Sequence, residues 1–177
     1  EANARAAQAA LNSEVFRVYR SDDLTGVELG GALKNIVAIG AGIIDSFSLG
    51  DNAKAAYVTR GLNEITRLGV AMGARAETFA GLSGLGDLVV TCYSGLSRNR
   101  RVGQEFGRGR KLPEILRDLK QTAEGVPTTQ AASRLARELG VEVPITDMTR
   151  RVLFEDMTPQ KAVEALMRRA PQPEVRL

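Results

Sequence analysis

The chain has 177 residues, of which 44% are hydrophobic and 25% charged, so it can bury one ordinary core and predicts a single domain. Its net charge of +3 is far from the clustered excess of a nucleic-acid binder and favours a small anion as partner. Histidine is absent and Cys92 is the only cysteine, which excludes an internal disulfide and a Cys/His metal site and indicates a reducing, cytoplasmic location. No apolar run approaches the roughly 20 residues of a membrane span, so we expect none.

The first twenty residues predict a helix followed by a strand. Residues 2–11 are alanine-rich and favour a helix, whereas residues 14–20 carry the β-favouring side chains Val15, Phe16, Val18 and Tyr19. No second such run follows, and a single strand leaves backbone groups unpaired on both edges. Because the sequence also begins at Glu1 without methionine, we expect a piece of a longer protein whose sheet lies elsewhere, or a strand that pairs with another copy.

A long helix is predicted from Val27 to Phe47, with polar residues 21–23 as its cap. Its apolar stripe consists of Leu29, Leu33, Ile36, Gly40, Ile43, Ile44 and Phe47. Lys34 lies off that stripe, on a face with the short side chains of Val27, Gly30, Gly31, Ala38, Ala41 and Asp45. Glycine inside a helix costs roughly 0.5 to 1 kcal/mol, so we expect close approach by another helix or a ligand. By itself, the spacing favours a solvated lysine at a helix edge.

Further helices account for the rest of the chain and predict an all-α fold. The second long helix is expected to be capped by Asp51 or Asn52 and ended by Gly73, with an apolar stripe and with Arg60, Glu64 and Arg67 facing water. Shorter helices are predicted at 76–80, 85–92, 99–106, 112–119, 128–139, 145–154 and 159–168. Prolines 113, 144 and 159 suit first turns, glycines 107, 109 and 140 suit helix ends, and Cys92 suits a small buried residue.

Four segments carry a resemblance to a known family. They are GVELGGALKN (26–35), GLGDLVVTC (84–92), SRNRR (97–101) and AEGV (123–126). In this order and spacing they resemble bacterial-type NAD(P)-dependent glycerol-3-phosphate dehydrogenase, over roughly residues 21 to 169. The resemblance implies that residues 21–170 are an all-helical substrate domain like the C-terminal domain of 6-phosphogluconate dehydrogenase. Residues 1–20 would be a helix-strand remnant of a Rossmann-type nucleotide domain, and residues 171–177 a loose tail.

The resemblance implies interconversion of dihydroxyacetone phosphate and sn-glycerol 3-phosphate with NAD or NADP, which supplies phospholipid synthesis. No Gly-x-Gly-x-x-Gly fingerprint follows a strand in this sequence, so the cofactor would be held mainly by the absent nucleotide domain. Lys34 matches the family's acid/base group, which protonates the alkoxide as hydride reaches C2. This chemistry needs a lysine that can lose its proton near neutrality, which a poorly hydrated groove favours.

The same resemblance implies a set of substrate contacts. Besides Lys34, the matching residues are Asn35, Asp87, Thr91, Ser97, Arg98 and Asn99. Asp87 and Thr91 share a helix face by their spacing, and Ser97 to Asn99 precede a helix whose backbone donors favour an anion. Each also has a plainer interpretation: a surface amide for Asn35, a helix-dipole carboxylate for Asp87, and a solvated basic turn for residues 97–101.

Cofactor contacts in the family match Arg98, Thr122 and Glu124. Thr122 departs from the family, which has an aliphatic residue there, and Pro127 replaces the usual aromatic residue. A different class of function also stays open, namely a helical interaction module in which Gly30 and Gly31 admit a partner helix and residues 98–101 bind acidic protein or RNA. A homodimer stays open as well.

Overall fold

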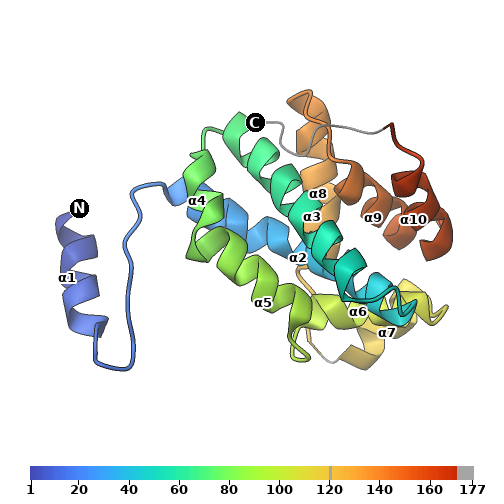
Figure 1. Cartoon of the computed structure of the whole chain (residues 1–177), viewed down its shortest axis with the longest axis horizontal. Coiled ribbons are helices and arrows are strands. Elements are labelled where there is room, and N and C mark those ends of the chain that lie inside the picture. Colours follow the sequence, from blue (N-terminus) through green and yellow to red (C-terminus); the bar gives the residue numbers. More distant parts are fainter. Residues whose placement is uncertain (120, 171–177) are drawn as a thin grey trace.

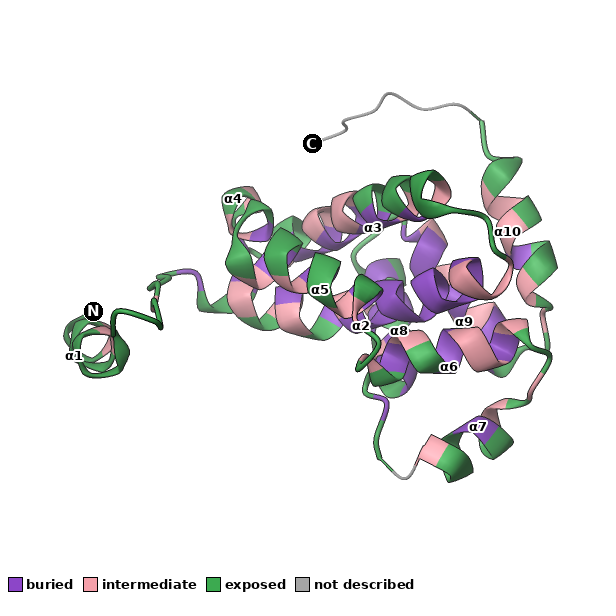
Figure 2. Ribbon diagram, turned by 60° about the horizontal axis from the view of Figure 1, so that its bottom comes forward, coloured by how far each residue is buried: buried purple, intermediate pink, exposed green. Residues whose placement is uncertain are grey.

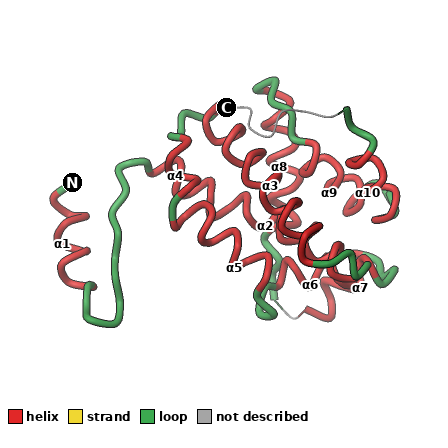
Figure 3. The backbone as a smooth tube through the Cα atoms, viewed as in Figure 1, coloured by secondary structure: helices red, strands yellow, loops and turns green. Residues whose placement is uncertain are grey.

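The computed structural model describes residues 1–119 and 121–170, and within them all regular structure is helical (Figures 1 and 3). The elements are α1 (Ala2–Leu11), α2 (Leu24–Ser46), α3 (Asp51–Ala71), α4 (Ala76–Ala80), the π-helical turn η1 (Leu82–Gly86), α5 (Asp87–Tyr93), α6 (Arg98–Gly107), α7 (Leu112–Leu119), α8 (Gly125–Glu138), α9 (Pro144–Phe154) and α10 (Pro159–Met167). The predicted all-α class is confirmed. The predicted loose tail, 171–177, lies outside the described residues.

Helix α2 runs through the middle of the domain and packs against α3, α5, α6, α8 and α9 (Figure 1). Figure 2 shows its buried surface, which is nearly continuous along the second half of the helix. Ala38 and Ala41, which were predicted to lie on an open face with Lys34, are 0% exposed. The prediction of a one-sided helix is therefore wrong for this half, because α5 and α6 cover the face that the periodicity left open.

The burial of α2 also bears on the membrane question. This helix has 23 residues, and the mean hydropathy of an 18-residue window within it is 1.5. It is therefore long and apolar enough to span a bilayer. The sequence-based statement that no run approaches that length was therefore too strict. However, 67% of the window is buried inside the domain, as in the core helix of a folded protein.

The glycines of α2 accept close neighbours from within the chain. A Cβ on Gly42 would lie 1.9 Å from the Arg100 carbonyl oxygen, and one on Gly103 would lie 1.8 Å from that of Ile39. The backbones of α2 and α6 are thus in direct contact, and larger side chains at either crossing would force them apart. At Gly42, the close approach expected along this helix is made by another helix of the same chain.

The start of α2 is capped as predicted. The Asp23 Oδ1 atom accepts a hydrogen bond from the Gly26 N–H at 2.9 Å. Its Oδ2 atom accepts from the Arg75 N–H at 2.9 Å and from the Thr78 hydroxyl at 2.6 Å. One carboxylate therefore joins α2 to the start of α4.

The predicted cap of α3 is wrong. Its N-cap is Gly50, no side chain closes the cap, and Asp51 is the first helical residue. Gly50 has φ of +87°, a left-handed conformation that glycine adopts without steric cost, and this allows the tight turn that starts the helix.

The predicted exposure of Glu64 is also wrong, since this side chain is buried with 4% exposure. It accepts hydrogen bonds from the N–H groups of Ile145 and Thr146, both at 2.8 Å, and from the Thr146 hydroxyl at 2.7 Å. Glu64 thus satisfies the free donors at the start of α9. Burial raises the pKa of Glu64, against these hydrogen bonds.

The strand predicted at residues 14–20 does not form, and no strand occurs in the parts of the chain that the structure describes. The segment is a loop that, with α1, stands away from the helical body (Figure 1). Its Val18 backbone pairs instead with side chains of the α1 region, through the Gln8 amide and the Asn12 carbonyl, each at 2.7 Å. A strand requires a second strand beside it, and residues 1–119 and 121–170 offer none.

Candidate functional site

Lys34 and Asp87 meet where α2 packs against α5. The Lys34 ammonium donates a hydrogen bond to Asp87 Oδ2 within an ion pair, and the two side chains are 18% and 34% exposed. The contact is possible because η1 lies directly on α2: a Cβ on Gly30 would be 2.5 Å from the Ser83 carbonyl oxygen. Lys34 is therefore a paired, partly buried lysine rather than a solvated one.

Thr91 lies on the same face of α5 as Asp87, as the spacing predicted. Its hydroxyl donates to the Asp87 carbonyl oxygen at 2.6 Å and lies 3.3 Å from Asp87 Oδ1. The carboxylate is thus contacted from two sides, by Lys34 at one oxygen and by Thr91 at the other. Asp87 is the first residue of α5, but η1 runs directly into α5 with Gly86 in a helical conformation, so the pairing with Lys34 rather than a free helix end accounts for this carboxylate.

Asn35 and Asn99 form a buried chain of hydrogen bonds across three helices. The Asn99 amide donates to the Asn35 carbonyl Oδ1 at 2.8 Å, and Asn99 Oδ1 accepts from the Gly125 N–H at 2.9 Å. The Asn35 amide donates to the Gly31 carbonyl oxygen at 3.2 Å. The surface interpretation of Asn35 is therefore wrong, and the starts of α6 and α8 are fixed relative to the middle of α2.

Ser97 and Arg98 lie at the start of α6, next to the hydrogen-bonded residues Asn35 and Asn99. The Ser97 hydroxyl accepts from the Arg100 N–H at 3.3 Å and so caps the helix. Arg98 is exposed, and no hydrogen bond or ion pair joins its guanidinium to the residues that the structure describes. A charged group with free donors at a helix start is well suited to a bound anion.

The two residues matched to cofactor contacts near α8 differ in their placement. Glu124 is exposed at the N-cap position of α8, directly before Gly125, whose N–H is bound by Asn99. Thr122 is also exposed, but no side-chain hydrogen bond connects it to the rest of this set. The structure thus gathers every predicted site residue except Thr122 around the facing parts of α2, α5, α6 and α8.

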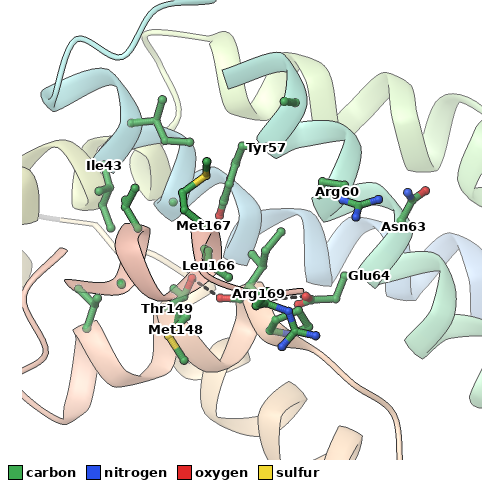
Figure 4. A pocket seen from close by; sticks show the side chains of 18 of the residues that line it. Ile43, Tyr57, Arg60, Asn63, Glu64, Met148, Thr149, Leu166, Met167 and Arg169 are labelled. Carbon is green, nitrogen blue, oxygen red and sulfur yellow. Dashed lines mark hydrogen bonds between the residues drawn. The ribbon is translucent and has the colours of Figure 1, made fainter. Parts of the chain in front are cut away.

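A large groove lies away from these residues. The groove of about 830 Å³ is bordered by α2, α3, α9 and α10 (Figure 4). Its walls are mainly apolar and include Tyr57, Met148, Leu166 and Met167. None of the residues predicted for the site lines this groove. Cavity size alone would therefore have pointed away from the charged residues that can do chemistry.

Thiol and metal chemistry find little support in the described part of the chain. Cys92 is buried as predicted, and burial raises the pKa of its thiol to about 12, so that no thiolate forms near neutral pH. No cluster of acidic, histidine or cysteine side chains suited to a metal ion occurs among residues 1–119 and 121–170.

One charged cluster beside the site was not predicted. Asp45 of α2 joins Lys54 of α3 and Arg100 of α6. The signal that could have revealed it is the position of Asp45, which is the only charged residue of α2 after Lys34. A charge kept within such an apolar helix needs a partner.

Comparisons with known proteins identify the relatives of this chain. A family model described as NAD-dependent glycerol-3-phosphate dehydrogenase C-terminus matches residues 23–164. Glycerol-3-phosphate dehydrogenase (NAD(P)+) of Syntrophotalea carbinolica is 58% identical over 94% of this chain and 50% of that protein. The protein of the same name from Citrifermentans bemidjiense is 54% identical over 96% and 50%. The crystal structure of the Coxiella burnetii glycerol-3-phosphate dehydrogenase superposes with a TM-score of 0.91 at 44% identity, over 95% of this chain and 52% of that one. The chain spans about half the length of the relatives it matches.

Proposed function

Because the chain belongs to the family of NAD-dependent glycerol-3-phosphate dehydrogenase C-terminal domains, we propose that it is the substrate-binding and catalytic half of such an enzyme. The reaction is the interconversion of dihydroxyacetone phosphate and sn-glycerol 3-phosphate. The observation that carries the proposal is the partly buried Lys34–Asp87 pair, which lies among the other residues of the family's site motifs. The product would enter phospholipid synthesis, and the enzyme would act in the cytoplasm.

Lys34 is the proton donor and acceptor of the proposed reaction. In reduction its Nζ gives a proton to the oxygen on C2, and in oxidation it takes that proton back. Asp87 orients the ammonium, and the Thr91 hydroxyl, which donates to the Asp87 backbone carbonyl oxygen, lies beside the second carboxylate oxygen. Gly31 lies one turn before Lys34, and a Cβ there would have no heavy atom within 4 Å, so a small substrate has room to approach along this face.

The phosphate of the substrate is assigned to the start of α6. We define Ser97, Arg98 and Asn99 as the phosphate-binding edge. Arg98 supplies a full positive charge and donors that can bind two oxygens at once, and Ser97 supplies a hydroxyl. Asn99 uses one amide hydrogen on Asn35, which leaves the other for a ligand.

The residues present fit a nicotinamide cofactor at the border of this domain. The free guanidinium of Arg98 and the exposed carboxylate of Glu124 can contact a dinucleotide, while the main binding surface is assigned to a nucleotide domain outside this chain. NAD(P)H supplies the hydride when bound. Thr122 remains the weakest of the proposed contacts, because its side chain is not connected to the others.

The alternative, a helical interaction module, is less well supported. Gly30 was proposed to admit a partner helix, but the space beside it is filled by Ser83 of the same chain. Arg100, counted in the basic turn, is occupied by Asp45. The features that suggested a docking surface are therefore largely used within the domain.

The test replaces Lys34 in the full-length enzyme that contains this chain. Lys34→Ala should lower kcat at least about a hundredfold with an unchanged circular dichroism spectrum. Lys34→Arg should also fail, since guanidinium stays protonated and cannot act as the base. Lys161→Ala, at an exposed lysine of α10, is the matched control and should keep full activity. Near-normal turnover of either Lys34 variant would contradict the assignment.

A further inference from the structure

Asp45 lies at the end of α2 between two cations from other helices. Lys54 Nζ lies 2.8 Å from Asp45 Oδ1 and 3.0 Å from Oδ2, and Arg100 Nε lies 2.5 Å from Oδ2. The side chain of Lys54 is 5% exposed, and those of Asp45 and Arg100 are each 19% exposed. One poorly hydrated carboxylate thus balances two charges that would otherwise repel each other.

The two cations also contact the end of α5 and the segment that follows it, residues 94–97. The Arg100 Nη1 donates to the Ser94 carbonyl oxygen at 3.3 Å, and Lys54 Nζ stands 4.3 Å from the centre of the Tyr93 ring. The other hydrogen bonds of this segment are local, such as those from the Ser94 N–H to the Val90 carbonyl oxygen at 2.9 Å and from the Leu96 N–H to the Ser94 hydroxyl at 3.1 Å, and Leu96 is 92% exposed. Asp45 therefore acts on this segment through Arg100, and on the end of α5 through Lys54.

The segment connects the two parts of the proposed site. It follows α5, which carries Asp87, and it leads into Ser97 and Arg98. We propose that Asp45 is a positioning residue, which sets the distance of the phosphate-binding edge from Lys34 without touching the substrate. Without its carboxylate, Arg100 loses its orientation and releases Ser94, so the turn that leads into Ser97 and Arg98 loosens while Asn99 stays bonded to Asn35. This inference rests on the proposed function.

Helix α6, which carries Arg100, also provides a matched control. At the other end of α6, Glu105 also binds two cations, with Arg108 Nη1 at 2.5 Å and Arg110 Nη1 at 3.0 Å. Its side chain is 13% exposed, similar to that of Asp45. None of these three residues contacts the segment before Ser97. Removing the charge of Glu105 therefore disturbs α6 to a comparable degree but leaves the phosphate-binding edge in place.

The experiment measures steady-state kinetics of the full-length enzyme with Asp45→Asn, Asp45→Glu, Arg100→Gln and Glu105→Gln. Asp45→Asn and Arg100→Gln should each raise KM for dihydroxyacetone phosphate about tenfold and change kcat and KM for NAD(P)H less than about threefold. The double variant should be little worse than either single one, because both changes break the same connection. Asp45→Glu should restore part of the loss, and Glu105→Gln should keep the parent KM.

The outcomes distinguish a failure of the proposed function from a failure of the positioning role of Asp45. An unsubstituted enzyme that does not reduce dihydroxyacetone phosphate would overturn the proposed function, and this role of Asp45 with it. An active enzyme in which Asp45→Asn and Glu105→Gln have the same KM, whether parental or raised, would overturn the positioning role alone. If Asp45→Asn does not fold, Arg100→Gln decides, and a parental KM in that variant counts against the proposal.

Discussion

At the scale of single residues, the members of the phosphate-binding edge differ in how far the fold already uses them. Asn99 is committed to Asn35 and Gly125, and Ser97 caps α6. Arg98 alone of the three makes no side-chain hydrogen bond or ion pair to the described residues. Loss of Arg98 should therefore act on the ligand, whereas loss of Asn99 would also loosen the junction of α2, α6 and α8.

Arg98→Ala should raise KM for dihydroxyacetone phosphate roughly tenfold or more, since hydrogen bonds to charged groups contribute about 1.5 to 3 kcal/mol. The free energy of unfolding should stay within about 0.5 kcal/mol of the parent, as is usual for surface changes. Arg98→Lys should restore only part of the affinity, because an ammonium lacks the planar pair of donors. Kinetics of the full-length enzyme and denaturant unfolding provide these two measurements.

Two controls test whether Arg98 acts on the phosphate. Turnover of unphosphorylated dihydroxyacetone should hardly change in Arg98→Ala, because there is no phosphate to lose. Arg101→Ala removes an exposed arginine one turn further along α6 and should have the parent KM. Equal losses for the phosphorylated and unphosphorylated substrates would assign Arg98 to the cofactor or the fold instead.

At the scale of elements, Asp23 connects two helices that are about fifty residues apart in the chain. Hydrogen bonds from the Thr78 hydroxyl and from the N–H groups of Arg75 and Gly26 hold the pKa of Asp23 below its usual range. The folded protein therefore binds fewer protons at this site than the unfolded chain does. The stabilisation is present above the unfolded pKa of 3.8 and is lost as pH falls through the lower folded value.

Asp23→Asn should lower Tm at neutral pH, because an amide retains one acceptor oxygen where the carboxylate has two. The Tm difference from the parent should be constant from pH 7 to 5 and should shrink below about pH 4, where the parent also loses its charge. Asp22→Asn, which removes an exposed ion pair with Arg75, should change Tm much less. A Tm difference that persists undiminished in acid would argue against a role for the carboxylate charge.

At the scale of the whole molecule, the helical body carries the proposed acid/base and phosphate groups but spans only half the length of its relatives. Helix α1 has no buried residue, and Phe16 and Tyr19 after it are mostly exposed. Such apolar surface is expected where a further part of an enzyme packs. A homodimer, which the sequence left open, would be a separate use of the surface.

The purified 177-residue chain should not catalyse NAD(P)H-dependent reduction of dihydroxyacetone phosphate, because hydride transfer needs a cofactor held against C2. A spectrophotometric assay of NAD(P)H consumption, with the full-length enzyme as positive control, measures this directly. Nuclear magnetic resonance titration with glycerol 3-phosphate should still show binding near Arg98 and should show clearly weaker binding in Arg98→Ala. Measurable turnover by the isolated chain would place the cofactor site within it.

The sequence by itself determined where most helices begin and end, because these signals are local. Asp23 caps α2, Pro144 and Pro159 start α9 and α10, and Gly140 follows α8 with φ of +66°. Such effects act over a few residues and can be read from spacing. The candidate site residues and their roles came from the resemblance of four segments rather than from periodicity.

Only the tertiary structure decided which polar groups are buried and what they bind. Lys34 meets Asp87 across 53 positions, Asn35 meets Asn99 across 64, and Glu64 caps a helix 81 positions away. The missing strand at residues 14–20 follows the same rule, since a strand is stabilised only by a neighbour. Helical spacing shows which side chains share a face, but burial and pairing depend on what lies opposite that face, and this is set by packing between distant parts of the chain.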